Sequence, residues 1–248
     1  MTKSQVNKLG ERLRAPGPPD DEDLALLQRF RERYSGPLRA AQESVRDHLH
    51  VETSARLKTI NTIVEKLRRE RTRLAEMQDI AGLRIVSEMT LARQDEMVSS
   101  ILLVYPGARV VDRRQEPSYG YRAVHVIPTV DGYPVEIQVR TKLQDLWAQA
   151  MEKLADEAGR EIRYGAVPEA RADEVEELRQ ISLAMAELET LHVELHQSAV
   201  TIPPPRRASS GQREALLARL HLRRLRAKAA AISQRIRDRL GVLLGGQR

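Results

Sequence analysis

The segment Val135-Glu136-Ile137-Gln138-Val139-Arg140-Thr141 alternates apolar and polar residues without interruption. Because successive side chains of a β-strand point to opposite faces, this pattern predicts a strand with Glu136, Gln138 and Arg140 on one face. A carboxylate, an amide and a guanidinium in a row are unusual on the surface of an ordinary sheet. This strand therefore predicts both a β-sheet and a polar site on it.

A second strand is predicted just upstream, at residues 121–127. Asp131-Gly132 lies between the two strands, and Asp-Gly is a favoured two-residue turn, so the pair is predicted to form a hairpin. The upstream strand would align Tyr121 with His125. An aromatic ring, an imidazole, a carboxylate and an arginine on neighbouring strands are side chains suited to a nucleotide site.

The composition predicts a soluble, cytoplasmic protein with a sizeable core. The chain has 248 residues, of which 41% are hydrophobic, and it has no cysteine, which excludes disulfides and thiolate metal sites. It has neither a run of eighteen apolar residues nor the layout of a signal peptide, so we expect no membrane span. The net charge of +6 is uneven, because residues 206–248 carry twelve Lys/Arg and two acids, a net +10. A block of this kind is typical of a segment that binds a polyanion or an acidic protein, or of a solvated helix face.

Periodicity and turn residues predict an α+β fold, in which a four-stranded mixed sheet is flanked by helices and followed by a C-terminal helical extension. The predicted strands are 83–87, 109–112, 121–127 and 135–141, and the predicted helices are 24–49 with an interruption near 35–37, 57–77, 91–105, 142–158, 169–197 and 212–244. The predicted organisation is a polar N-terminal segment (1–22), a main domain (23–200), a Pro-rich linker (201–211) and a basic amphipathic helix (212–248).

Positive charge gathers around the predicted helix 57–77. Thr62, Lys66 and Arg69 follow helical spacing and share one face, with Arg56 and Lys58 at its start. Arginine can grip phosphate oxygens with two hydrogen bonds, and lysine acts as a point charge. The pattern indicates a phosphate-binding face, although a solvated basic face has the same pattern.

Asp79 stands at the start of the strand that follows, ahead of Gly82 and Arg84. A carboxylate at a strand edge beside a phosphate-binding helix suits Mg²⁺, which prefers one or two carboxylates together with substrate phosphates. Glu136 would be the second carboxylate. A turn or cap residue is the alternative for Asp79. For Tyr121 the alternatives are stacking on a base and closing an edge of the core.

Four ordered motifs together resemble a known family, the RelA/SpoT synthetase domain, over roughly residues 40–165. They are Arg56-x-Lys58 with Thr62 and Lys66, Gln78-Asp79-Ile-Ala-Gly-x-Arg84, Gly120-Tyr121-Arg-x-x-His125, and Glu136-Ile-Gln138-Val-Arg140-Thr141.

The resemblance implies a nucleotidyltransferase-like fold and an ATP-dependent pyrophosphokinase of the small alarmone synthetase type. Such an enzyme transfers the β,γ-pyrophosphate of ATP to the ribose 3′-hydroxyl of GDP or GTP, which yields (p)ppGpp and AMP. Because no upstream segment is long enough for a hydrolase domain, we expect synthesis without hydrolysis. Carried over by motif, the ATP-binding residues are Arg56, Lys58, Thr62, Lys66, Arg69 and Arg84, the catalytic and Mg²⁺-binding residues are Asp79 and Glu136, and the acceptor-binding residues are Tyr121, His125, Gln138 and Arg140.

One departure from the family pattern leaves the acceptor open. In the helix that begins near Trp147, Lys153 follows Glu152 where many members have histidine. This version resembles a branch with toxic members, some of which transfer pyrophosphate to the 3′ CCA end of tRNA and are neutralised by an antitoxin. The alternatives are therefore tRNA as acceptor, and a catalytically silent module that binds RNA or an antitoxin.

The basic helix at the C-terminus also carries an apolar stripe at helical spacing. Its interpretations are packing on the domain or on another helix, as in a homo-oligomer, binding of RNA or a partner protein, and binding to a membrane surface. The stripe consists of Leu225, Ala229, Ile232, Ile236, Leu240 and Leu243.

Overall fold

The computed structural model describes residues 1–201 and 211–245. The chain forms two compact units. The first, called the sheet unit here, comprises Met1–Val86, Met97–Val111 and Val124–Val139. The second, the helical unit, comprises Ser87–Glu96, Asp112–Ala123 and Arg140–Arg248.

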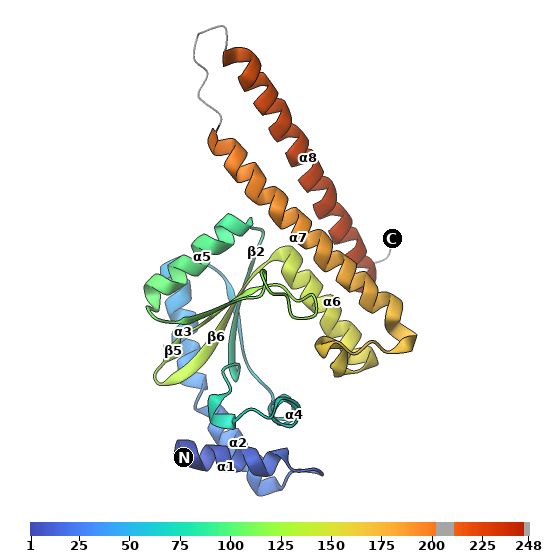
Figure 1. Cartoon of the computed structure of the whole chain (residues 1–248). Helices are drawn as coiled ribbons and strands as arrows, with labels where there is room; N and C mark the ends of the chain where they lie inside the picture. The colour runs from blue at the N-terminus through green and yellow to red at the C-terminus, as the bar shows by residue number, and fades with distance from the viewer. Residues whose placement is uncertain (202–210, 246–248) are drawn as a thin grey trace. The chain divides into compact units, whose positions relative to one another are not determined.

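The sheet unit is built on six strands in the order β1-β2-β6-β4-β3, with β5 paired to β6 (Figure 1). The pairs β1/β2, β4/β6 and β5/β6 are antiparallel. Helices flank the sheet, and α3 packs against β1 and β5. The strands are β1 (Thr53–Leu57), β2 (Ala81–Ser87), β3 (Arg109–Asp112), β4 (Val124–Ile127), β5 (Thr129–Val130) and β6 (Tyr133–Thr141), and the helices are α1 (Lys3–Arg14), α2 (Asp21–Glu32), α3 (Ser35–Leu49) and α4 (Ile60–Glu70), followed by a short 3₁₀ turn (Leu74–Glu76) and, after β2, by α5 (Leu91–Val104).

The predicted alternation of β6 is confirmed. Val135, Ile137 and Val139 are fully buried, and the residues between them are only partly so. Strand β2 alternates in the same way. This period of two sends the apolar side chains into the core and leaves the other face of each strand to the polar residues.

The predicted polar N-terminal segment (1–22) contains a helix, α1. Thr2 and Gln5 form a reciprocal capping box at its start, and Val6, Leu9 and Leu13 are buried. These three side chains lie at helical spacing and cover α4 and the 3₁₀ turn. Periodicity does not predict this helix, because a stripe of only three apolar residues in twelve is a weak signal.

The predicted helix 57–77 is wrong at both ends. Residues Thr53–Leu57 form the edge strand β1, and α4 begins only after Thr59, whose side chain accepts a hydrogen bond from the Thr62 amide. The helix ends at Glu70, and the next residue, Arg71, adopts the left-handed conformation (φ 52°). Arg56 and Lys58 therefore belong to the strand and its exit, not to a helix.

The hairpin turn is confirmed, with positive φ at both Asp131 (49°) and Gly132 (81°). The upstream strand begins at Val124, however, so Tyr121 is not on it. Tyr121 pairs with Ser118 in an isolated bridge across a turn formed by Tyr119 and Gly120, both with positive φ. The sequence misplaced Tyr121 because this turn interrupts the apparent alternation.

The helical unit contains three long helices, α6 (Lys142–Ala158), α7 (Ala172–Thr201) and α8 (Gly211–Leu243). Helices α7 and α8 run side by side in opposite directions (Figure 1). The apolar stripe of α8 is buried in one core with α6 and α7, so packing within the chain is the interpretation that the structure supports. Of the predicted linker (201–211), residues 202–210 lie outside the described residues.

The predicted α+β class is confirmed, as a mixed sheet flanked by helices with a C-terminal helical extension. Within residues 1–201 and 211–245 the structure contains no helix that is both long and apolar enough to cross a membrane.

Candidate active site

Asp79 lies at the centre of a charged cluster in the sheet unit. Its Oδ2 atom accepts hydrogen bonds from Lys58 Nζ at 2.7 Å and from Lys66 Nζ at 2.8 Å. Lys58 is held just after β1, where its backbone amide donates to the Ile80 carbonyl at 2.8 Å, and Lys66 projects from α4. Burial raises the pKa of Asp79, but the two ammonium groups outweigh it and bring the pKa below the ordinary value.

The second carboxylate oxygen of Asp79 is open. Oδ1 is buried and has no hydrogen-bond partner among the described residues. A buried anionic oxygen without a donor is costly, unless a cation or a ligand completes its coordination. Asp79 therefore fits a Mg²⁺ ligand, with the open oxygen available to the metal.

Glu136 is held from two sides. His125 Nδ1 lies 3.0 Å from Oε1, and Gln138 Nε2 donates to Oε2 at 2.7 Å. Burial and the nearby Asp79 raise the pKa of Glu136, whereas the contacts with His125 and Gln138 lower it, and the net direction is downward. Glu136 is thus an ionised carboxylate with a fixed orientation, and we call its contacts the His125–Gln138 clamp.

The two carboxylates belong to one electrostatic cluster. Burial lowers the pKa of Lys66, while Asp79 and, more weakly, Glu70 and Glu136 raise it, so that the net pKa is above the ordinary value. The described residues contain no group of three or more His, Cys, Asp or Glu side chains that could enclose a metal. Two carboxylates are nevertheless sufficient for Mg²⁺ when substrate phosphates and water complete its shell.

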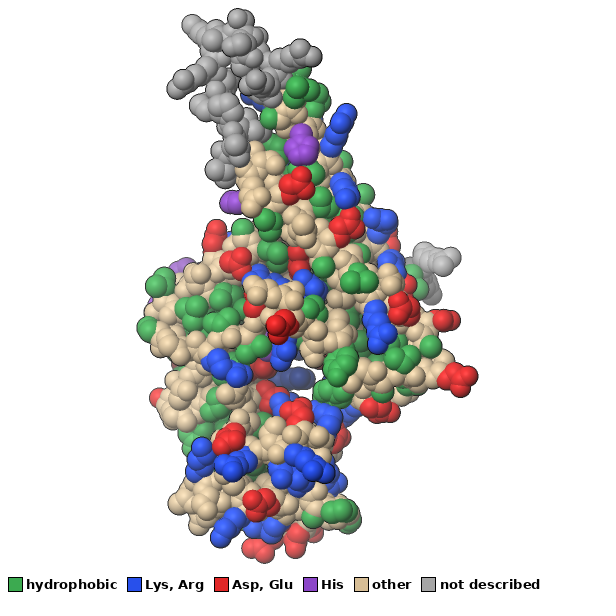
Figure 2. Space-filling model, in the orientation of Figure 1, with side chains coloured by type: hydrophobic (Ala, Val, Ile, Leu, Met, Phe, Trp, Pro, Cys, Tyr) green, Lys and Arg blue, Asp and Glu red, His purple; other side chains and the backbone are tan. Residues whose placement is uncertain are grey.

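The other predicted ATP-binding residues lie on β1, β2 and α4, where their surroundings differ. Arg56 is exposed on β1, and Arg84 lies on β2 opposite Ser54. Arg69 is ion-paired with its neighbour Glu70 at 2.8 Å, and Thr62 donates its hydroxyl to the Thr59 carbonyl at 2.9 Å. On the face seen in Figure 2, Lys and Arg side chains gather over the part of the sheet unit that holds α1, α2 and α4. The structure brings Lys58 and Lys66 to Asp79, and it leaves the roles of the other four residues as predictions.

Two of the predicted acceptor residues, Tyr121 and Arg140, meet in the helical unit. Arg140 donates from Nη2 to the Tyr121 hydroxyl at 2.9 Å, and its guanidinium carbon lies 5.1 Å from the centre of the Tyr121 ring. Arg140 also donates from Nη1 to Asp145 at 3.1 Å, and both charged side chains are almost fully buried. Asp145 was missed from the sequence, although it stands in the first turn of the helix that directly follows the strand.

The turn before Tyr121 is fixed by its surroundings. The Gly120 carbonyl accepts a hydrogen bond from the Ser182 hydroxyl at 2.7 Å, and a Cβ on Gly120 would lie 2.8 Å from the Trp147 ring. Trp147 itself is buried and donates to the Leu178 carbonyl at 2.7 Å. The position of Tyr121 is therefore set by α6 and α7.

A family model described as "Region found in RelA / SpoT proteins" matches residues 55–155. This stretch, the RelA/SpoT region of the chain, is therefore similar to RelA/SpoT proteins. All twelve predicted site residues lie within it, as do Asp145 and Trp147. The region spans β1 to most of α6, and it excludes α1, α2, α3, α7 and α8.

Curated relatives of the chain are uncharacterised proteins of Mycobacterium tuberculosis and Mycobacterium bovis. Each is 42% identical over 122 residues, which is 48% of this chain and 45% of the relative. The match thus covers less than half of the length of these relatives.

Solved structures with similarity to the chain include the small alarmone synthetase 1 from Bacillus subtilis. It shares 26% identity, with a TM-score of 0.47, over 67% of this chain and 97% of the synthetase. The same enzyme bound to AMPCPP gives a TM-score of 0.45 at the same identity and coverage. A complex of the type VI effector Tas1 with its immunity protein shares 13% identity, with a TM-score of 0.33, over 92% of this chain and 99% of the matched chain.

Lys153, at the departure from the family motif, has a structural contact outside the RelA/SpoT region. Its Nζ donates to the Leu243 carbonyl at 3.3 Å, at the last turn of α8. A lysine there satisfies a carbonyl that has no partner within the helix and complements the negative end of the helix dipole. This contact gives a reason for the lysine that is independent of the acceptor.

Proposed function

We propose that the chain is an ATP- and Mg²⁺-dependent pyrophosphokinase that transfers the β,γ-pyrophosphate of ATP to the 3′-hydroxyl of GDP or GTP. The observation that carries the proposal is the cluster at Asp79 within the RelA/SpoT region. It combines a carboxylate that has one open buried oxygen, two lysines, and a second carboxylate in a fixed orientation.

The reaction makes one bond and breaks one. The acceptor 3′-oxygen bonds to the β-phosphorus of ATP, the bond from that phosphorus to the oxygen bridging to the α-phosphate breaks, and AMP leaves with that oxygen. The acceptor hydroxyl gives up its proton. Transfer of this kind needs alignment and charge neutralisation more than covalent help from the protein.

Glu136 suits the role of proton acceptor. Its pKa is lowered, so the carboxylate is ionised near neutral pH, and the His125–Gln138 clamp fixes its direction. An oriented carboxylate can hydrogen-bond the attacking hydroxyl and take its proton as the new bond forms.

Lys58 and Lys66 suit the role of phosphate ligands. In the absence of ATP they neutralise Asp79, and their Nζ atoms both lie within 2.8 Å of one carboxylate oxygen. Bound Mg²⁺, held by Asp79 and Glu136, would neutralise charge on the phosphates. The lysines would then be available to the phosphate oxygens, where a positive charge stabilises the charge that develops during transfer.

Tyr121 suits the acceptor base. Its hydroxyl is fixed by Arg140, and Arg140 is fixed by Asp145, so the ring has a defined orientation before any ligand binds. A pre-oriented aromatic ring loses little conformational entropy when a base stacks on it.

The test is transfer of label from ATP carrying ³²P in the γ position. The purified chain is incubated with Mg²⁺ and, in separate reactions, with GDP, GTP or deacylated tRNA. Label in a guanosine nucleotide, with AMP formed in equal amount, supports the proposal. Label in the tRNA 3′ end would replace the proposed acceptor, and absence of transfer to all three would overturn the proposed activity.

Two matched variants tie the activity to the cluster. Asp79→Asn and Glu136→Gln keep the size of each side chain and remove its charge, and we expect each to lower transfer by at least about a hundredfold. Lys153→Ala is the control, because it alters only the contact with α8 and should leave the choice of acceptor unchanged.

A further inference from the structure

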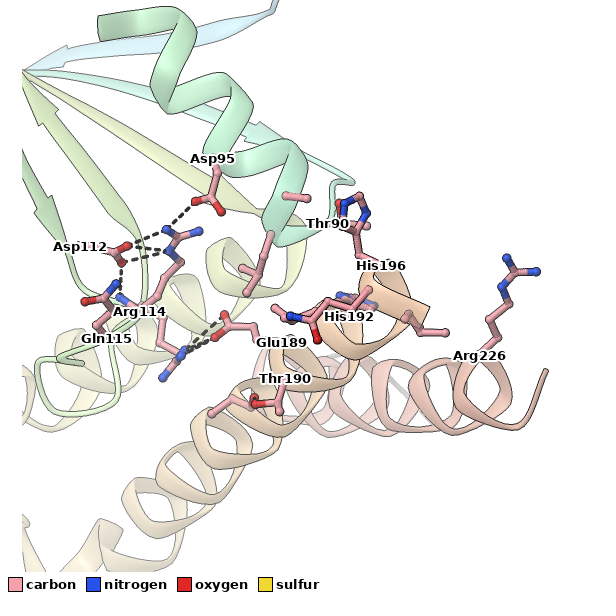
Figure 3. A pocket seen from close by; sticks show the side chains of 17 residues that line it. Thr90, Asp95, Asp112, Arg114, Gln115, Glu189, Thr190, His192, His196 and Arg226 are labelled. Carbon is pink, nitrogen blue, oxygen red and sulfur yellow. Dashed lines mark hydrogen bonds and ion pairs between the residues drawn. The ribbon is translucent and has the colours of Figure 1, made fainter. Parts of the chain in front are cut away.

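Glu189 of α7 is a largely buried charge in the helical unit, with 13% of its side chain exposed. It lines one wall of a pocket of about 630 Å³ (Figure 3). Helix α7 lies outside the RelA/SpoT region, and no step of the proposed transfer uses this carboxylate. Its hydrogen bonds nevertheless lead to the residues that hold Tyr121.

The Glu189 carboxylate is held from two directions. Arg122 donates from Nε to Oε2 at 3.1 Å and forms an ion pair with the same oxygen through Nη2. Gln144 donates from Nε2 to Oε1 at 3.1 Å. Both partners are buried. Because one carboxylate reaches both partners at once, Glu189 forms a bridge of defined geometry between them.

This bridge runs beside the one that fixes Tyr121. The two partners of Glu189 are sequence neighbours of Tyr121 and Asp145, since one directly follows Tyr121 and the other directly precedes Asp145. Arg140 connects Tyr121 with Asp145, and Glu189 connects their neighbours. The turn before β4 and the first turn of α6 are thus joined at two successive residues. Two such connections restrict the relative movement of the segments more than one does.

The Gln144 amide has its other hydrogen bonds already in place. Its Oε1 atom accepts from the Thr141 backbone amide at 3.0 Å and from Gln94 Nε2 at 2.9 Å. Gln94 is fully buried on α5 and accepts from Arg114 Nη1 at 3.2 Å. A flip of the Gln144 amide would break both bonds to Oε1. Loss of the Glu189 carboxylate therefore leaves a buried donor without its acceptor, a cost that a shift of α6 would relieve.

We propose that Glu189 is a positioning residue for the acceptor. It fixes the turn that carries Tyr121 against the start of α6, so that Arg140 meets the Tyr121 hydroxyl and the ring is presented in one orientation. Glu189 acts through Tyr121 and does not touch the substrate. The inference rests on the proposed function, in which Tyr121 stacks on the acceptor base, and it gives α7 a part in acceptor binding.

The first test reads the orientation of Tyr121 in the full chain without any substrate. The chain has six tyrosines, so the ring signals of a tyrosine-labelled sample can be assigned by nuclear magnetic resonance with single Tyr→Phe variants. Glu189→Gln keeps the size of the side chain and removes its charge. We expect it to shift the signals of Tyr121 and to leave those of Tyr34, which packs against Tyr133 in the sheet unit, unchanged. Unchanged Tyr121 signals would overturn the inference, whether or not the chain transfers pyrophosphate.

Glu187→Gln is the matched control on the same helix. Glu187 pairs with Lys228 at 2.9 Å, and both side chains are about half exposed. Its substitution should leave the Tyr121 signals as they are. Equal shifts in the two variants would show a general effect of charge on α7 and contradict a specific role for Glu189.

The second test separates the two substrates. Glu189→Gln should raise the KM for GDP by about tenfold and leave the KM for ATP nearly unchanged, because the predicted ATP-binding residues lie on β1, β2 and α4. In a Tyr121→Ala background the same substitution should add no further effect, because no ring is left to orient. An equal rise in both backgrounds would contradict the inference. Absence of transfer by the wild-type chain would instead contradict the proposed function, and the Tyr121 signals would then decide the inference alone.

A double variant separates positioning from stability. Glu189→Gln leaves the buried Arg122 without its counter-charge, so this variant also loses stability. Replacement of a buried ion pair by apolar side chains of similar size is often neutral, so Arg122→Met combined with Glu189→Met should recover most of the lost urea midpoint. We expect this double variant to keep the altered Tyr121 signals and the raised KM for GDP. Wild-type signals and KM in the double variant would assign the effects of Glu189→Gln to destabilisation and overturn the inference.

Discussion

At the scale of the residue, Asp79 neutralises two lysines at once, and this makes a prediction about stability. In Asp79→Asn the partly buried Lys58 and Lys66 lose their shared counter-charge, so we expect the free energy of unfolding near neutral pH to fall by about 1–3 kcal/mol. Urea unfolding of the variant beside the wild-type chain measures this change. Asp131→Asn, at the exposed hairpin turn, is the matched control and should change little.

The contacts of Asp79 with Lys58 and Lys66 also predict that the stability of the chain depends on pH. The pKa of Asp79 in the folded chain lies below the ordinary value of 3.8, so its contribution to stability is complete above that value and is lost as pH falls through the folded pKa. The difference between the wild-type chain and Asp79→Asn should therefore shrink as the pH falls below 3.8 and disappear once the pH is below the pKa of Asp79 in the folded chain. A difference that persisted unchanged in acid would show that the loss comes from packing and not from charge.

The His125–Gln138 clamp makes a prediction about kinetics. If His125 acts by orienting Glu136, His125→Ala should lower kcat by about 10- to 100-fold and leave the KM for the acceptor nearly unchanged. His125→Gln, which keeps a donor, should recover part of the rate. A raised KM with normal kcat would instead support the acceptor-binding role that the motif implies.

The residues of the site were more predictable than their contacts. Alternation along β6 placed Glu136 and Gln138 on one face, but it could not show that the amide of Gln138 is used by Glu136. The motifs also gave Arg140 without its partner Asp145, because a contact between a strand and the next helix depends on how the chain turns at Thr141. Sequence patterns fix which face a side chain takes, and tertiary packing decides what it touches.

At the scale of the element, the errors follow from weak local signals. The strand Thr53–Leu57 has no alternation of burial and lies at a sheet edge, so its pairing with β2 is a long-range contact that periodicity does not report. Helix α6 was predictable to the residue, because it has a capping box from Thr141 to Gln144 and a broad apolar face. A cap together with a broad apolar face thus makes an element predictable, whereas β1, which depends on its neighbour, and α1, which has a capping box but only three apolar residues in its stripe, are not predicted.

The turn at Gly120 makes a prediction with a matched glycine as control. Gly120→Ala adds a Cβ at 2.8 Å from Trp147 to a residue with φ of 92°, so both a clash and backbone strain result. Gly132→Ala has a similar φ of 81° and meets no atom within 4 Å, so it carries strain alone. We expect Gly120→Ala to lose about 1–3 kcal/mol and Gly132→Ala about 1 kcal/mol. Thermal unfolding compares the two, and equal losses would contradict a role for Trp147 in fixing the turn.

At the scale of the whole molecule, acidic side chains of neighbouring elements neutralise part of the positive charge of the C-terminal segment. Lys228 pairs with Glu187 and Arg237 with Glu88, each at 2.9 Å, and Arg239 pairs with Glu177. Along α7 and α8 the positive and negative side chains are interspersed on the face seen in Figure 2. A net charge counted along the sequence therefore overstates the field that a polyanion would meet, because acids of α7 and of the segment before α5 offset part of it.

The core of the helical unit makes the last prediction. Trp147 is the only tryptophan of the chain and lies in the same core as Ile236 of α8, so its fluorescence reports on the packing of α8. Ile236→Ala removes a fully buried side chain and should lower the free energy of unfolding seen by Trp147 by about 2–5 kcal/mol. Leu217→Ala, at a position of α8 that is 58% exposed, should cost less than about 0.5 kcal/mol. If the two variants unfolded alike, α8 would not be part of the core that surrounds Trp147, and its apolar stripe would have to serve another contact.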